Sequence, residues 1–347
     1  MKQVSEANKA MSPRVMRTRY RILMLFACIA ILVISVAMSL SLGSRSVTLA
    51  EIIGGIMKNA DFSMGELVVH ERIPRTIFGP IAGCALAVSG TLMQAITRNP
   101  LADPGILGVN TGASLAIVVG IAFFGIAALP QYMAFALFGA AITAVFVYAT
   151  GSLGRGGATP IKLALAGTAT GAALSSLVSL ILLPRSSSMD SFRFWQSGGI
   201  GGATYEGMLT IAPLIVLGMC VGIFSLRSLN ALALGDDVAA SLGVRTTRTR
   251  LLGAVAGVVL CAATTALAGP IGFIGLVAPH IVRLAVGSDL RYVLPLSALV
   301  GASILLLADT IGRVAGSPGE IEAGLVSAFV GAPILVLIAV RSKVRAL

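Results

Sequence analysis

Few residues in this sequence have the type and spacing that chemistry requires. No HExxH, GxSxG or GxxxxGK[ST] motif occurs, which excludes the corresponding zinc-hydrolase, serine-hydrolase and P-loop ATPase mechanisms. His70 and His280 are far apart in the chain, and we expect each to be a packing residue rather than a base. Asp309 lies deep in an apolar run, where it could relay protons, but Arg313 follows one helical turn later. We therefore predict a structural pair, Asp309–Arg313, and no catalytic residue, metal ligand or cofactor site in this chain.

The composition is that of an integral membrane protein. Of 347 residues, 56% are hydrophobic and 11% are charged, and the mean hydropathy is +0.96; a soluble domain of this size could not bury so much apolar surface. The net charge of +11 comes from basic residues scattered between apolar runs, which indicates topology signals rather than a nucleic-acid-binding patch. The four cysteines all lie inside apolar runs without metal-ligand spacing, so we expect them to be buried and unpaired.

The apolar runs predict an all-α fold with about ten transmembrane helices. The expected spans are 22–42, 76–97, two within 104–154, 163–183, 207–226, one full and one broken span within 251–282, 293–312 and 323–340. Residues 1–21 form a polar lead, residues 22–341 the transmembrane domain, and residues 342–347 a short tail. Gly and Pro break the apolar pattern near 104–112 and 269–280, and we expect these pieces to line a cavity.

The basic residues set the orientation. With the N-terminus in the cytoplasm, 18 of the 25 Lys and Arg residues fall on the cytoplasmic side, as the positive-inside rule predicts. Both termini are then cytoplasmic. Spans two to five and seven to ten begin on opposite sides of the membrane, as two inverted repeats would.

The longest polar interruption of the C-terminal half is the cytoplasmic loop 228–250. We expect Asp236 to cap a short helix, Asp237–Leu242, about 10 Å long, which Gly243 ends. Val238, Ser241 and Leu242 would share its mildly apolar face. Two interpretations are open at this point: an ordinary solvated loop, or a helix that a soluble partner grips at the membrane surface.

Three groups of motifs occur in a specific order along the chain. They are RIPRT (72–76) with QAITRNPLADPGILG (94–108), then GDDVAASLGV (235–244), then GPIGFIGLVAPHIVR (269–283) continuing to PLSALVGASILLLADTIGR (295–313). In this order they closely resemble the FecCD-type permease subunits of bacterial ABC importers for iron–siderophore, haem and cobalamin. The resemblance covers nearly the whole chain.

The resemblance implies a fold, a location and partners. It implies ten transmembrane helices of the type II importer class in the bacterial cytoplasmic membrane. The permease would work with a second permease subunit, identical or paralogous, with two cytoplasmic ATPase subunits that bind ATP and magnesium, and with an extracytoplasmic binding protein. Nucleic acid has no place among these partners.

The resemblance also implies site residues. It implies a coupling helix that sits in a groove of the ATPase, outward arginines that meet acidic residues of the binding protein, and a cytoplasmic gate. The coupling set is Gly235, Asp236, Asp237, Val238, Ser241, Leu242 and Gly243; the docking set is Arg72, Arg75 and Arg313; the pathway and gate set is Asn110, Thr159 and Pro160. The chain departs from the family pattern at Gly319–Gly324, where Glu322 replaces a common proline.

The expected function is therefore that of a non-enzymatic permease subunit which passes a large iron chelate, first of all a ferric siderophore, into the cytoplasm. A haem or cobalamin permease is the alternative within the family. An ion-coupled secondary transporter is the rival from another class, but it would need several ionisable groups at the membrane midplane, which the spans do not offer. Co-purification with an ATPase would distinguish these two classes.

Overall fold

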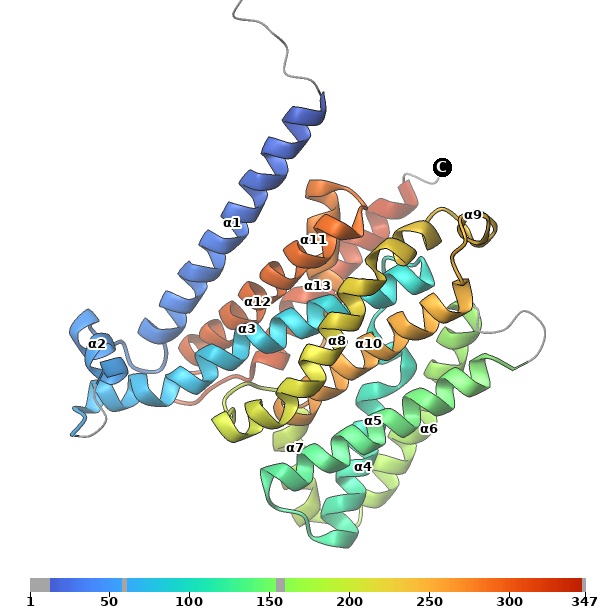
Figure 1. The fold of residues 1–347 in the computed structure, drawn as a ribbon. Helices are drawn as coiled ribbons and strands as arrows, with labels where there is room; N and C mark the ends of the chain where they lie inside the picture. Colours follow the sequence, from blue (N-terminus) through green and yellow to red (C-terminus); the bar gives the residue numbers. More distant parts are fainter. Residues whose placement is uncertain (1–12, 58–60, 154–159, 345–347) are drawn as a thin grey trace, which may run out of the picture.

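The computed structural model describes residues 13–57, 61–153 and 160–344, and every regular element in these ranges is a helix (Figure 1). In chain order the elements are α1 (Pro13–Ser41), α2 (Leu49–Met57), α3 (Met64–Thr97), η1 (Pro104–Leu107), α4 (Val109–Val119), η2 (Gly120–Phe124), α5 (Leu129–Gly151), α6 (Pro160–Leu182), α7 (Ser186–Gln196), α8 (Tyr205–Leu232), α9 (Asp236–Ser241), α10 (Thr246–Ala268), α11 (Ile274–Val286), α12 (Leu290–Ala315) and α13 (Ala323–Val344).

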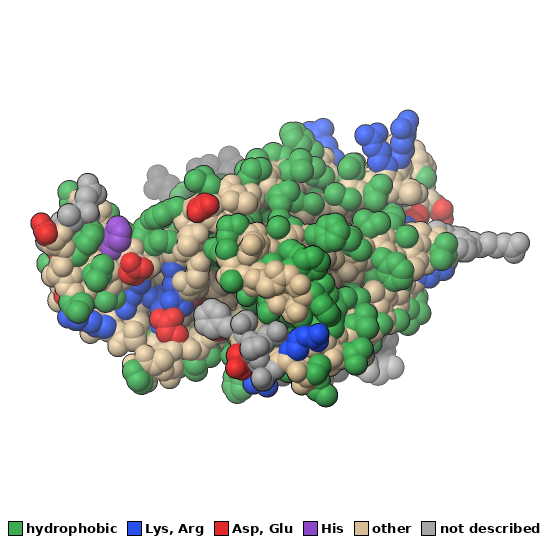
Figure 2. Space-filling view, turned by 90° about the horizontal axis from the view of Figure 1, so that it is seen from below, with side chains coloured by type: hydrophobic (Ala, Val, Ile, Leu, Met, Phe, Trp, Pro, Cys, Tyr) green, Lys and Arg blue, Asp and Glu red, His purple; other side chains and the backbone are tan. Residues whose placement is uncertain are grey.

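Ten of these segments are apolar enough to account for the expected spans. Seven helices have the length and hydropathy to cross a membrane: α1, α3, α5, α6, α8, α10 and α12. Three shorter apolar segments, Val109–Phe124, Ile274–Val286 and Ala323–Val336, complete the set. The predicted all-α membrane fold with about ten spans is confirmed. Hydrophobic side chains also cover much of the middle of the face in Figure 2, whereas charged side chains gather mainly toward its ends.

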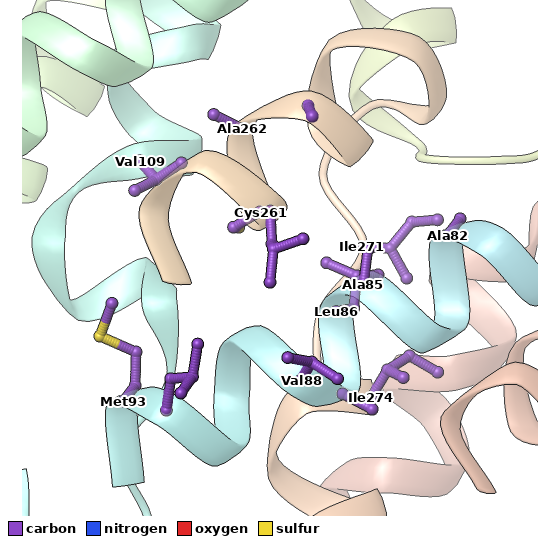
Figure 3. Packing of buried hydrophobic residues seen from close by; sticks show 14 of the residues in the cluster. Ala82, Ala85, Leu86, Val88, Met93, Val109, Cys261, Ala262, Ile271 and Ile274 are labelled. Carbon is purple, nitrogen blue, oxygen red and sulfur yellow. The ribbon is translucent and has the colours of Figure 1, made fainter. Parts of the chain in front are cut away.

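Helix α3 is the central element. It has 34 residues, about 51 Å at 1.5 Å per residue, and it contacts α1, α2, α8, α10, α11 and α12. A capping box begins it, because the Ser63 hydroxyl accepts the backbone N–H of Glu66 while the Glu66 carboxylate accepts the N–H of Ser63. Figure 3 shows how Ala82, Leu86 and Met93 of this helix meet α10 and the loop before α11. Most of α3 is buried, so it forms the core of the subunit.

Two sets of four spans repeat the same contacts in opposite orientation. Helix α3 contacts α11 and α12, and α10 correspondingly contacts α4 and α5. The two leading helices also pack against each other and run antiparallel: Ile96, near the end of α3, lies beside Gly253, near the start of α10. Thus α3–α6 and α10–α13 form the predicted inverted repeats.

The broken segments pack against the rest of the protein and also contribute to cavity walls, as expected: Phe273, Ile274 and Val277 line a cavity of about 260 Å³, and Gly112 lines one of about 690 Å³. Arg98 and Gly108 have left-handed backbone conformations before α4, and Gly269 and Phe273 have positive φ angles before α11. The free polar groups of these breaks find protein partners, because Gln94 Nε2 donates to the Gly275 carbonyl at 3.2 Å and Thr265 Oγ1 donates to Asn110 Oδ1 at 3.1 Å. Irregular backbone at membrane depth requires either protein or water as a partner, and here protein supplies it.

Glycine allows close helix crossings at α3. A methyl group added at Gly83 of α3 would overlap the carbonyl oxygen of Gly301 in α12, and one added at Gly90 would overlap the backbone of Gly275 in α11. Small residues let helix backbones approach in a membrane, where the hydrophobic effect does not drive helices together. At these crossings, glycine therefore serves close helix packing, as expected.

The molecule has two distinct ends. Helix α9, the start of α1 and the end of α13 lie toward one end, and α2 and α7 lie toward the other (Figure 1). The positive-inside rule assigns the α9 end to the cytoplasm. We call the two ends the cytoplasmic and the outer end.

This orientation predicts opposite labelling of two exposed positions. Ser63, before α3, and Thr247, in the first turn of α10, are exposed at the outer and the cytoplasmic end. Ser63→Cys should react with a membrane-impermeant thiol reagent in intact cells, and Thr247→Cys should react only after the membrane is opened. The unsubstituted chain, with its four native cysteines, provides the background. Labelling of both positions from the same side would contradict the orientation.

Candidate coupling and docking sites

Helix α9 forms where a docking helix was expected. It spans Asp236–Ser241 and begins after Gly235, whose φ of 121° only glycine adopts readily. Leu242 follows the last helical residue, and Gly243 has a φ of 80°, so the predicted glycine stop is confirmed. The helix ends one residue earlier than expected.

The predicted capping role of Asp236 is wrong. Gly235 occupies the cap position, and Asp236 is the first helical residue. Its carboxylate instead forms ion pairs with Arg98, at the end of α3, and with Arg250, whose Nη2 lies 2.9 Å from Asp236 Oδ2. Two guanidinium groups therefore pair with the Asp236 carboxylate in place of the backbone amide that a cap would use.

An apolar surface projects from α9 at the cytoplasmic end. Val238 is 45% exposed and Leu242 is 62% exposed, whereas Ala239 is buried against the body of the protein. The Ser241 hydroxyl donates to the carbonyl of Val238 and adds no apolar contact of its own. Leu234, which the sequence analysis did not include, is 65% exposed just before the helix. We define Leu234, Val238 and Leu242 as the α9 apolar surface.

At the outer end, Asp309 and Arg313 form the predicted structural pair. Arg313 Nε lies 3.0 Å from Asp309 Oδ2, and both side chains are almost fully buried. Arg75 of α3 adds a second ion pair, because its Nε lies 2.9 Å from Asp309 Oδ1, and its Nη1 lies 2.7 Å from Glu320 Oε2. A buried carboxylate is stable as an anion only when it is paired and hydrogen-bonded. Here Arg75 Nε donates a hydrogen bond to Oδ1, and Arg313 forms an ion pair with Oδ2.

The expectation that Arg72 and Arg313 face outward is wrong. Arg313 is 1% exposed, and its Nη2 donates to the carbonyl and the hydroxyl of Ser39 in α1. Arg72 is 6% exposed and donates to the carbonyls of Leu40 and Arg45. The free carbonyls at the end of α1 attract these cations, as the C-terminus of any helix does. These arginines therefore hold α1, α3 and α12 together at the outer end, and Arg75 is the one that reaches a surface cavity.

That cavity has a volume of about 820 Å³ and opens at the outer end. It is lined by Arg75, Ala127, Leu129, Tyr132, Trp195, Gly199, Gly201, Gly202, Leu267, Ala268, Glu320 and Glu322. Burial raises the pKa of the Glu322 carboxyl, while the nearby Arg75 opposes this shift. The departure from the family pattern at Glu322 thus adds an acid to the cavity wall rather than to an exposed loop.

Two of the three expected pathway and gate residues, Asn110 and Pro160, lie among the described residues. Thr159 lies outside the described residues, and Pro160 begins α6. Asn110, on α4, is bonded to Thr265 of α10 and joins the two repeats. The gate assignment therefore stays a prediction.

The remaining polar candidates of the sequence are the histidines and the cysteines. His70 stacks on Phe62, with ring centroids 4.8 Å apart. Among the described residues, no three His, Cys, Asp or Glu side chains come close enough to hold a metal ion. The four cysteines are unpaired, but the expectation that all are buried is wrong, because Cys220 is exposed.

Comparison with known proteins places these features in a family. The model of the FecCD transport family matches residues 31–341. The chain is 44% identical to the ferric enterobactin transport system permease protein FepD of Escherichia coli (strain K12), over 91% of this chain and 94% of that protein. It is 37% identical to the Fe(3+)-citrate import system permease protein YfmD of Bacillus subtilis (strain 168), over 94% and 97%. A solved structure described as an inward-facing metal-chelate type ABC transporter covers 92% of this chain and 99% of its own, with 28% identity and a TM-score of 0.78. The chain is a membrane protein that belongs to the FecCD transport family.

Proposed function

We propose that this chain is the permease subunit of an ATP-driven importer that passes a ferric siderophore from an extracytoplasmic binding protein into the cytoplasm. The observation that carries this proposal is the α9 apolar surface, which protrudes at the cytoplasmic end of a membrane-embedded body. Exposed leucine and valine side chains on a short, glycine-bounded helix are suited to the groove of a soluble partner. The family and the names of the relatives support an ATPase as that partner and an iron chelate as the cargo.

In this mechanism the chain performs no covalent step. Two ATPase subunits, which bind ATP and magnesium, approach each other and move the α9 helices that they hold. Two permease subunits then rock against each other and open the path to one side or the other. The movement requires only that each nucleotide state of the ATPase holds a different position of α9. The second permease would be a copy of this chain or a paralogue.

The outer cavity gives the binding protein a place to deliver its cargo. Its walls combine Tyr132 and Trp195 with charged groups, Arg75, Glu320 and Glu322, on a floor that includes glycine backbone. Docking through Arg75 remains part of the proposal, since this arginine reaches the cavity while Arg72 and Arg313 are buried.

The rival function, an ion-coupled secondary transporter, lacks a free carrier group at the position where it was expected. Asp309 is the acid deep in an apolar run, and it is held between Arg75 and Arg313. A proton carrier must release and bind its proton during each cycle, whereas this carboxylate is already engaged in two ion pairs. Haem and cobalamin remain the alternative cargoes within the family.

Transport in reconstituted vesicles tests the proposal. The chain is co-expressed with the ATPase and the binding protein of the importer and purified in mild detergent, and the ATPase should co-purify with the chain. Vesicles with ATP inside should then take up the ferric siderophore only when the binding protein is present outside. Uptake of haem or cobalamin instead of the ferric siderophore would show that the proposed cargo is wrong. Uptake driven by a proton gradient without ATP would overturn the proposal.

A further inference from the structure

Helix α9 is attached to the rest of the protein by little apolar packing. It has six residues, and Ala239 is its buried side chain. The helix contacts α8 and α10. A partner that pulls on the α9 apolar surface could therefore bend α9 away from the membrane domain unless other contacts hold it in place.

Asp236 supplies such contacts from a single carboxylate. Its ion pair with Arg98 reaches the residue that ends α3 in a left-handed conformation, with φ 50°. Its ion pair with Arg250 reaches the first turns of α10. One side chain thus joins α9 to the leading helices of both inverted repeats, although Arg98 and Asp236 are 138 positions apart in sequence.

The two leading helices can carry a displacement through the membrane. They contact each other from their cytoplasmic ends to the middle of α10, where Ser89 Oγ donates to the carbonyl of Gly257 and Met93 lies against Gly257. Arg98 follows the last residue of α3, and this one helix, with Pro80 inside it, contains Arg75, whose guanidinium lines the outer cavity. A movement at Asp236 is therefore applied directly to the helix that runs from the cytoplasmic end to the cavity.

The three ionised side chains are too exposed for a mainly stabilising role. Arg98, Asp236 and Arg250 are 35%, 44% and 21% exposed, and ion pairs at exposed sites contribute little to the free energy of unfolding. Their position between three helices is the feature that needs explanation.

We propose that Asp236 is a positioning residue which, through Arg98 and Arg250, transmits the movement of α9 to α3 and α10. This inference rests on the proposed function, because it requires an ATPase that holds α9. The two arginines, which lie outside α9, then have a coupling role that differs from the role of the residues that bind the ATPase.

Substitutions of the two arginines distinguish the transmission of movement from the binding of the ATPase. In Arg98→Gln and Arg250→Gln the α9 apolar surface is unchanged, so the ATPase should still co-purify with the permease. The amount of chelate transported per ATP hydrolysed should fall at least threefold in each variant. Arg248→Gln is the matched control, because Arg248 lies two residues from Arg250 and is exposed, with no ion pair to Asp236. It should keep the wild-type ratio.

A second comparison excludes a purely structural effect. Asp236→Asn should lower the transport-to-hydrolysis ratio as the arginine variants do, and Asp236→Glu, which keeps the charge, should restore most of it. Equal ratios in wild type, Arg98→Gln and Arg250→Gln would overturn the proposed transmission, as would loss of the ATPase from both variants. If the wild-type chain itself does not retain an ATPase, the proposed function fails instead, and this result is visible before any ratio is measured.

Discussion

Leu242→Asp should release the ATPase from the permease and stop uptake. Leu242 is 62% exposed on the α9 apolar surface, and burying one such side chain in a partner contributes about 1.5–3 kcal/mol. Losing it lowers affinity about 10- to 100-fold, because each 1.4 kcal/mol is a factor of ten, and a carboxylate in an apolar groove lowers it further. The measurements are the amount of ATPase that co-purifies and the rate of chelate uptake at equal membrane abundance.

The control for this change is Leu153→Asp. Leu153 follows α5 and is 72% exposed, but it lies outside α9. It should retain the ATPase. Normal uptake by the Leu242→Asp protein would mean that loop 228–250 is an ordinary solvated loop.

Asp309→Asn should destabilise the whole subunit. The substitution keeps the shape of the side chain but removes the anion that pairs with Arg75 and Arg313. The side chains of both arginines are mostly buried. Breaking a buried ion pair by removing one partner typically costs about 3–5 kcal/mol, because it leaves a buried charge uncompensated. We expect a clearly lower midpoint of thermal unfolding in detergent and less protein in the membrane.

Glu320→Gln is the matched control, since Glu320 pairs with the same arginine but is 40% exposed. Exposed pairs contribute about 0–1 kcal/mol, so the unfolding midpoint should change little. If both substitutions shifted the midpoint equally, burial would not be the reason that Asp309 matters.

The spans and the local pairs could be predicted because they depend on neighbours in sequence. Continuous apolar runs identify membrane helices, and four residues separate Asp309 from Arg313 on one helix face. The glycine stop at Gly243 was predictable for the same reason, since a left-handed residue after a short helix is a local requirement.

The partners of the arginines could not be predicted, because they come from distant segments. Arg75 and Asp309 are 234 positions apart, and Arg98 and Asp236 are 138 apart. The motif RIPRT indicated that its arginines are important but not that Arg72 turns inward to the carbonyls at the end of α1. The local sequence is also compatible with Asp236 as a helix cap. The ion pair with Arg98 of the distant α3 segment is a tertiary contact that the local sequence does not reveal.

The glycine crossings also limit how the chain can evolve. At Gly83 and Gly90 any side chain would overlap the backbone of a neighbouring helix, so substitutions along this face of α3 should be rejected whatever the cargo. At Gly202, on the wall of the outer cavity, an added side chain would meet no other atom. Substitutions that adapt the protein to a new chelate should therefore accumulate at the cavity wall, while the centre of the subunit changes little. In a library of random variants selected for growth on different iron chelates, the surviving substitutions should lie at the cavity wall and not at the glycine crossings.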